Sequence, residues 1–95
     1  MGARTFDGVM VSVDGAPLSP RGDLKTFSLD GFEWGYEGPD PTQLALAILA
    51  DAADDEAALA FASAFMTEIV ANFDNEWEMT EEQVRAALQA LRNIQ

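Results

Sequence analysis

Hydrophobic and polar positions alternate near the start of the chain. Every second residue of Val9–Val13 is a valine, and Asp14 and Gly15 follow at once. Successive side chains of a strand point to opposite faces, and Asp-Gly is typical of tight hairpin turns. The pattern therefore predicts a strand that enters a hairpin, with a short return strand ended by Pro17 or Pro20.

A second alternation follows in the segment KTFSLDGFEWGY. If this segment is a strand, its aromatic residues share one face and its acids lie on the other. The aromatic face would be Phe32, Trp34 and Tyr36, and the opposite face Glu33, Gly35 and Glu37. We expect the aromatic side chains to be core, and the two glutamates to join an acidic surface.

The periodicity then changes to that of helices. In GPDPTQLALAILADA, Asp40 is suited to cap a helix, Pro41 to its first position and Gln43 to a capping box. A second helix should begin near Asp54. Because the run from 57 to 73 has only four polar residues, we expect that helix to be the buried, central one.

The last segment predicts an amphipathic third helix. Thr80 and Gln83 have the spacing of a capping box, and Met79 can pack on Val84 as a hydrophobic staple. The apolar stripe is Val84, Ala87, Leu88, Leu91 and Ile94, whereas Glu81, Glu82, Arg85, Gln89 and Arg92 face water. We predict an α+β fold in one domain, residues 1–95: a small antiparallel β-sheet, a hairpin plus a further strand, packed against three α-helices.

Charge adds the strongest functional indication. Seventeen acids against five bases give a formal net charge of -12. A field of this sign repels nucleic acid and anionic membrane and attracts basic surfaces, so we expect a basic protein partner, without direct nucleic-acid or membrane binding. The absence of cysteine, of a ~20-residue apolar span and of a signal-peptide core favours a cytoplasmic protein. We expect a monomer.

Catalytic and metal-binding patterns are scarce. The chain has no histidine and no cysteine, which removes the commonest general base, the commonest transition-metal ligand and the thiol nucleophile. A pair of carboxylates could still act in hydrolysis, but seventeen acids place some pairs close together by chance. No calcium-loop or glycine-rich phosphate motif is present. We expect no enzyme, no metal and no cofactor.

The acids gather at particular places along the chain. Six lie where a helix start favours negative charge: Asp40, Asp54, Asp55, Glu56, Glu81 and Glu82. Others crowd two predicted corners, the first being Asp51, Asp54, Asp55 and Glu56, the second Asp74, Glu76, Glu78, Glu81 and Glu82. A seventeen-residue helix would separate the corners by about 25 Å at ~1.5 Å per residue. Such a span could imitate the phosphates of a duplex, which carries one charge per ~1.7 Å.

The middle of the chain also carries a family resemblance. The segments VSVDGAPLSPRGDL and GFEWGYEGPDPTQLALAILAD, within Val11 to Asp51, resemble a family of small bacterial and phage proteins of unassigned function. That family shares x-V-D-G-x-P-L-x-P-R-x-D-L and then G-F-E-W-G-Y-x-G-x-x-P-x-Q-L-A-L-A-[IL]-L. Its members have been associated with anti-CRISPR activity, and this chain is similar to an inhibitor of a type I-C surveillance complex. The resemblance implies a basic partner, the DNA-binding channel or PAM-reading subunit of a CRISPR effector, and no catalytic residues.

Two classes of function remain open from the sequence. In the first, the protein is a stoichiometric anti-CRISPR inhibitor that uses its acidic corners in place of phosphates. In the second, it is an acidic interaction module of a bacterial cell whose basic partner does not bind DNA. A carboxylate-dependent hydrolase is a third reading, and it would need a concave pocket that holds two acids.

Overall fold

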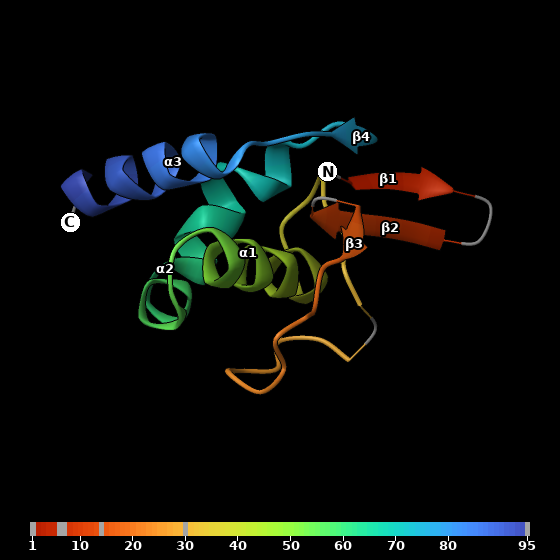
Figure 1. The fold of residues 1–95 in the computed structure, drawn as a ribbon, viewed down its shortest axis with the longest axis horizontal. Helices are drawn as coiled ribbons and strands as arrows, with labels where there is room; N and C mark the ends of the chain where they lie inside the picture. Colours follow the sequence, from red (N-terminus) through yellow and green to blue (C-terminus); the bar gives the residue numbers. More distant parts are fainter. Residues whose placement is uncertain (1, 6–7, 14, 30, 95) are drawn as a thin grey trace.

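The fold consists of a small sheet on one side and three helices that share one core. A computed structural model describes residues 2–5, 8–13, 15–29 and 31–94, without the side chains of residues 3–5, 8–10 and 94. The elements follow the order β1, β2, β3, α1, α2, a 3-10 turn (η1), β4 and α3 (Figure 1). The predicted α+β architecture, with a small antiparallel sheet and three helices, is confirmed.

The sheet brings residues near the N-terminus next to residues 76–77, just before the third helix. Its strands are β1 (Gly2–Thr5), β2 (Gly8–Val13), β3 (Ala16–Pro17) and β4 (Glu76–Trp77), in the antiparallel order β3-β2-β1-β4. The predicted hairpin is β2 with β3, and the described part of its turn, Gly15, has the positive φ of 84° that such turns need. Asp14 lies outside the described residues. The sequence did not indicate β1 or β4.

The contact between β1 and β4 depends on a glycine. Gly2 pairs with Trp77, and a Cβ atom at Gly2 would collide with the Trp77 indole. The indole ring therefore lies directly against the backbone of β1. Among the described residues, nothing accepts a hydrogen bond from the buried indole N–H of Trp77.

The strand predicted over residues 32–37 is wrong. The segment is an irregular loop, because Gly31 and Gly35 adopt φ values of 101° and 83°, which turn the chain out of an extended path. The loop is instead fixed to η1, where the Gly35 N–H donates to the Val70 carbonyl (3.1 Å). Its aromatic residues consequently share no face: Trp34 is fully buried, whereas Tyr36 is 47% exposed. The expectation that Tyr36 belongs to the core is corrected.

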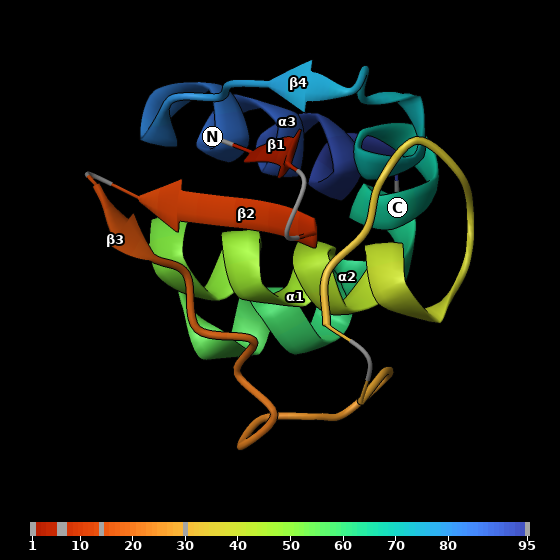
Figure 2. The ribbon, with the colours of Figure 1, turned by 90° about the vertical axis from the view of Figure 1, so that its right-hand side faces the viewer.

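Helix α1 (Pro39–Ala52) is the central helix of the fold. Ten of its fourteen residues are buried, and Figure 2 shows β2 on one side of it and α2 on the other. The predicted cap is wrong by two positions: Gly38 is the N-cap, no side chain caps the helix, and Asp40 accepts a hydrogen bond from the Ser28 hydroxyl instead.

Gln43 also has a different role from the predicted capping box. Its side chain is buried inside the long loop that precedes α1. Its Oε1 accepts from the backbone N–H groups of Phe27 (2.6 Å) and Ser28 (3.2 Å). Its Nε2 donates to the carbonyls of Pro20 (2.6 Å) and Lys25 (3.1 Å). One amide thus satisfies four loop groups, which explains why a polar residue lies in the core.

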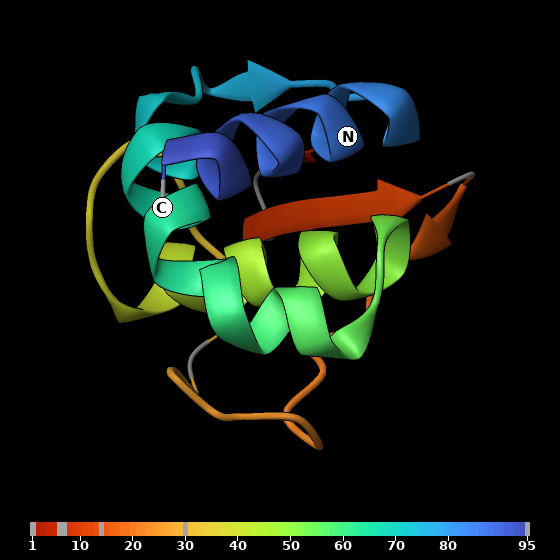
Figure 3. The same cartoon turned by 90° about the vertical axis from the view of Figure 1, so that its left-hand side faces the viewer.

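Helix α2 (Asp55–Glu68) begins where it was predicted, but it is not the buried helix. Only Ala57, Ala58, Ala62 and Phe65 are buried in it. Leu59 is 48% exposed, and a 3-10 turn, η1 (Val70–Asn72), follows the helix. A helix that is apolar all round was expected at the centre. The central position goes to α1, which lies between β2 and α2 (Figure 3) and also contacts α3 and η1.

Helix α3 (Glu81–Ile94) follows the sequence prediction closely. The Thr80 hydroxyl accepts from the Gln83 N–H (3.1 Å), and the Gln83 side chain accepts from the Thr80 N–H (2.9 Å), as a capping box requires. Val84, Leu88 and Leu91 are buried, and the polar face is exposed. The Ile94 side chain lies outside the described residues.

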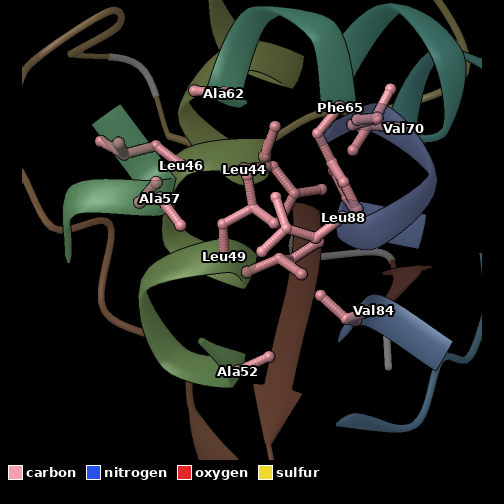
Figure 4. Packing of buried hydrophobic residues seen from close by; sticks show 14 of the residues in the cluster. Leu44, Leu46, Leu49, Ala52, Ala57, Ala62, Phe65, Val70, Val84 and Leu88 are labelled. Atoms are coloured by element: carbon pink, nitrogen blue, oxygen red, sulfur yellow. The ribbon is translucent and has the colours of Figure 1, made fainter. Parts of the chain in front are cut away.

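The helices meet in one hydrophobic cluster. Leu44 and Leu49 of α1, Phe65 of α2, Val70 of η1 and Leu88 of α3 converge there (Figure 4). Around it pack Trp34 and the half-buried Trp77, whose rings meet edge to face at 5.8 Å. Every element beyond the sheet contributes to this core, which fixes the positions of the surface acids relative to one another.

Candidate partner-binding surface

The first predicted acidic corner lies at the junction of α1 and α2, and we name Asp51, Asp54, Asp55 and Glu56 the junction acids. All four are exposed. Two of them also serve the fold. Asp54 is the N-cap of α2, where its carboxylate accepts from the Ala57 N–H (2.7 Å), and Asp55 pairs with Arg21 (3.2 Å). Asp51 and Glu56 are therefore the members with no such structural role among the described contacts.

The second corner is a strip instead of a cluster. We name Asp74, Glu76, Glu78, Glu81 and Glu82 the strip acids, and all five are exposed. They follow the extended chain through β4 into the first turn of α3, as Figure 2 shows along its upper edge. At ~3.3 Å per extended residue, the strip from Asp74 to Glu81 has a length on the order of 20 Å.

Arg85 joins the two groups of acids. Its Nε donates to the carbonyl of Ala52 at the end of α1 (2.7 Å), and its Nη2 pairs with Glu81 (2.6 Å). The last turn of α1 has no basic residue of its own, so α3 supplies the cation that its exposed carbonyls favour. Because one guanidinium contacts both Glu81 and the Ala52 carbonyl, the Glu81 end of the strip lies beside the junction, closer than the expected separation of about 25 Å.

Glu33 and Glu37 lie away from the junction acids. Glu33 is half-buried and accepts from the Trp34 N–H (3.2 Å). Glu37 is exposed and accepts from the hydroxyl of Thr67 (3.5 Å), near the C-terminal end of α2. The junction acids lie at the other end of this fourteen-residue helix, about 20 Å away at ~1.5 Å per residue. The two loop glutamates therefore lie far from the junction acids, on either side of a loop segment, 34–36, that lines a pocket with Asp74 and Glu76 of the strip.

The described basic side chains neutralise few of the junction and strip acids. Arg21 hydrogen bonds to Asp23 (3.0 Å) as well as Asp55, which lowers the pKa of the Asp23 carboxyl and raises the pKa of the guanidinium. Lys25 lies over the Phe27 ring and Arg92 over the Phe61 ring. As a result, described arginines pair with Asp55 and Glu81, and the other seven junction and strip acids have no ion pair among the described residues.

Sequence reasoning did not foresee a groove beside the strip. It is lined by Trp34, Gly35 and Tyr36 on one side and by the segment 73–76 on the other. The only signal for it was the density of aromatic and glycine residues in GFEWGY. The groove is formed by two segments that are about forty residues apart in sequence. Local spacing does not predict that they lie together.

Among the described residues, the acids form no metal site and the helices no membrane span. In that part of the chain, no group of three or more acids is arranged to hold a metal ion. None of the described helices has the length and apolar character needed to cross a bilayer.

The geometry defines a small acidic α+β domain with exposed carboxylates at the α1–α2 junction and along β4 into the start of α3. The chain belongs to the family of unknown function DUF6166, whose family model matches residues 1–90. No curated protein matches the chain, and no solved structure does.

Proposed function

We propose that this protein is a non-catalytic inhibitor that occupies a basic, nucleic-acid-binding surface of another protein. The observation that carries the proposal is the set of seven carboxylates, along the strip and the junction, that lack an ion pair among the described residues. Like charges held this close are unfavourable for folding, and a partner rich in lysine and arginine would relieve their repulsion.

The sequence resemblance supplies a specific partner for the proposal. A type I-C CRISPR surveillance complex binds its target duplex in a channel lined by basic residues, which recognise phosphates and not sequence. The inhibitor would act as a monomer in the bacterial cytoplasm and fill that channel. The strip and junction acids would take the places of successive phosphates.

Competition with DNA tests the proposal. Purified surveillance complex is titrated with this protein, with and without saturating target duplex, at low and high salt. Binding that duplex abolishes and that salt weakens steeply is the expected result, since association between opposite charges is screened. Equal binding with and without duplex would contradict occupation of the DNA channel. Absence of binding would exclude this complex as the partner.

A pair of variants on one helix tests the surface itself. Glu56 and Glu68 are both exposed and lie at opposite ends of α2. Glu56→Lys reverses one charge of the junction acids and spares the cap Asp54 and the pair of Asp55 with Arg21. We expect it to weaken binding about tenfold, equivalent to ~1.4 kcal/mol. Glu68→Lys is the control and should change binding less than about twofold. Equal losses for both variants would mean that net charge, and not this surface, determines binding.

A further inference from the structure

The groove beside the strip combines aromatic and acidic side chains. Its volume is about 760 Å³, and it lies open to solvent between the loop 34–36 and the segment 73–76. Figure 2 shows this loop, in yellow, beside the turn that connects η1 with β4. The groove is separate from the junction acids, which lie at the far end of α2.

Both walls of the groove are fixed by contacts within the fold. The loop is held to η1 by the hydrogen bond from Gly35 to Val70 (3.1 Å). The opposite wall is held by Phe73, whose ring stacks on Trp77 with centroids 4.4 Å apart and planes 16° from parallel. Trp77 in turn meets the buried ring of Trp34. Because both walls are held in place before a ligand binds, the entropy cost of binding is reduced.

The exposed ring of the groove is Tyr36. Its edge packs on Gly38, where an added Cβ would come within 3.1 Å of the Tyr36 Cε2 atom. The ring thus packs against the backbone at Gly38, although 47% of Tyr36 is exposed. An aromatic face that a fold holds at its surface can bind a cation.

The opposite wall supplies the negative charge. Asp74 and Glu76 are exposed, line the groove, and pair with no described arginine or lysine. The described lining includes no basic side chain. An aromatic ring and two carboxylates that line one groove are complementary to a flat cation that can stack and donate several hydrogen bonds at once.

We propose that this groove binds an arginine side chain of the basic partner. The guanidinium would stack on Tyr36 and donate to Asp74 and Glu76. Arginine is favoured over lysine because an ammonium group is a compact, strongly hydrated charge that neither stacks nor forms a planar fork. The inference rests on the proposed function only for the source of the arginine.

The groove is tested with a small probe and no partner. N-acetyl-arginine amide is titrated into the ¹⁵N-labelled protein, and the amide signals of Gly35 and Asn75 are followed. We expect saturable shifts centred on the groove at millimolar concentrations. N-acetyl-lysine amide should bind at least about threefold more weakly, and N-acetyl-citrulline amide, which has the same shape without the charge, should cause no saturable shift. Equal shifts from arginine and citrulline, or no saturation with arginine, would overturn the assignment.

Variants locate the binding groups. Tyr36→Leu should weaken arginine binding about fivefold, and Asp74→Asn with Glu76→Gln about tenfold, whereas Asp51→Asn with Glu56→Gln removes the same charge elsewhere and should leave the affinity within about twofold. Because all these positions are exposed, loss of folding is not expected, and circular dichroism checks it. Equal weakening by the two double variants would overturn the groove assignment in favour of a general charge effect.

The outcomes separate this inference from the proposed function. If arginine fails to bind while the surveillance complex still binds in competition with duplex, the groove assignment is wrong and the inhibitor proposal stands. If arginine binds as expected and the complex does not, the groove assignment stands and the partner is a different basic protein.

Discussion

Helices α1 and α2 have the same length and a similar apolar content, but they have different roles in the fold. Both have fourteen residues, and α1 buries ten of them whereas α2 buries four. The apolar residues of α2 extend around the helix and include the half-exposed Leu59. Hydrophobic composition therefore did not decide which helix is central.

Position in the fold decides it instead. The long loop before α1 folds back over the helix and is held there by Gln43, while the sheet covers another side. Helix α2 packs on α1, η1 and α3, but its outward side, which includes Leu59, is left exposed. The comparison teaches that burial of an apolar helix depends on which segments cover it, here the long loop and β2 over α1, and not on its composition alone.

The largest expected effect comes from truncating a core residue of α1. Leu46 is fully buried, so Leu46→Ala should lower the free energy of unfolding by about 3 kcal/mol, through lost transfer energy and the cavity left behind. Leu59→Ala in α2 is the matched variant and should cost less than about 1 kcal/mol, because half of Leu59 is already in water. Urea denaturation measures both. Equal losses of unfolding free energy for Leu46→Ala and Leu59→Ala would contradict the inference that α1 is the more buried helix.

Removal of the polar anchor of α1 ranks second. Gln43→Leu keeps the approximate size of the side chain but leaves four loop groups without their partner, and we expect a loss of about 2 kcal/mol. Hydrogen exchange should accelerate at the amides of Phe27 and Ser28. Gln89→Leu on the exposed face of α3 is the control and should leave both quantities nearly unchanged. Unaltered exchange at Phe27 would show that Gln43 does not hold the loop.

A smaller effect is expected at the start of α2. Asp54 caps that helix, whereas no side chain caps α1. Asp54→Ala should therefore cost about 1 kcal/mol in thermal or urea unfolding. Asp54→Asn keeps the accepting oxygen and should retain most of the stability. If the alanine and asparagine variants were equally unstable, the hydrogen bond to Ala57 would not be the stabilising contact.

The smallest effect is the pH dependence of the ion pair between Arg21 and Asp23 within the long loop. The hydrogen bond from Arg21 lowers the pKa of Asp23 in the folded state, so its contribution is present above the unfolded pKa. That contribution is lost as the pH falls through the folded pKa. Asp23→Asn should slightly reduce the slope of stability against pH below about pH 4. An unchanged slope would show that the exposed pair contributes nothing measurable.

Local signals predicted the helices better than the sheet. The capping box of Thr80 and Gln83 uses contacts within three residues and was found as expected, and α2 begins next to Asp54, as predicted. The strand at 32–37 failed because glycine torsions override side-chain alternation, which the sequence pattern does not reveal. The misassigned Gln43 satisfied a local rule, but its real partners lie fifteen or more residues away.

The acidic surface, too, was predicted only in part from the sequence. The residues of both corners were identified from the sequence and all are exposed. Their arrangement was not predictable, because it depends on Arg85 reaching from α3 to the last turn of α1, thirty-three residues earlier. Long-range pairing of this kind needs the tertiary fold.

The pairing of Gly2 with Trp77 has a consequence for the order in which the protein is made. Strand β1 leaves the ribosome well before its outer neighbour β4, which follows more than seventy residues later. The β1–β2 hairpin can form early, and until Trp77 emerges the outer edge of β1 has unpaired backbone groups that invite pairing with other chains. The interval between these two events is the period in which a nascent chain is most exposed to aggregation, and slower translation before residue 77 would lengthen it.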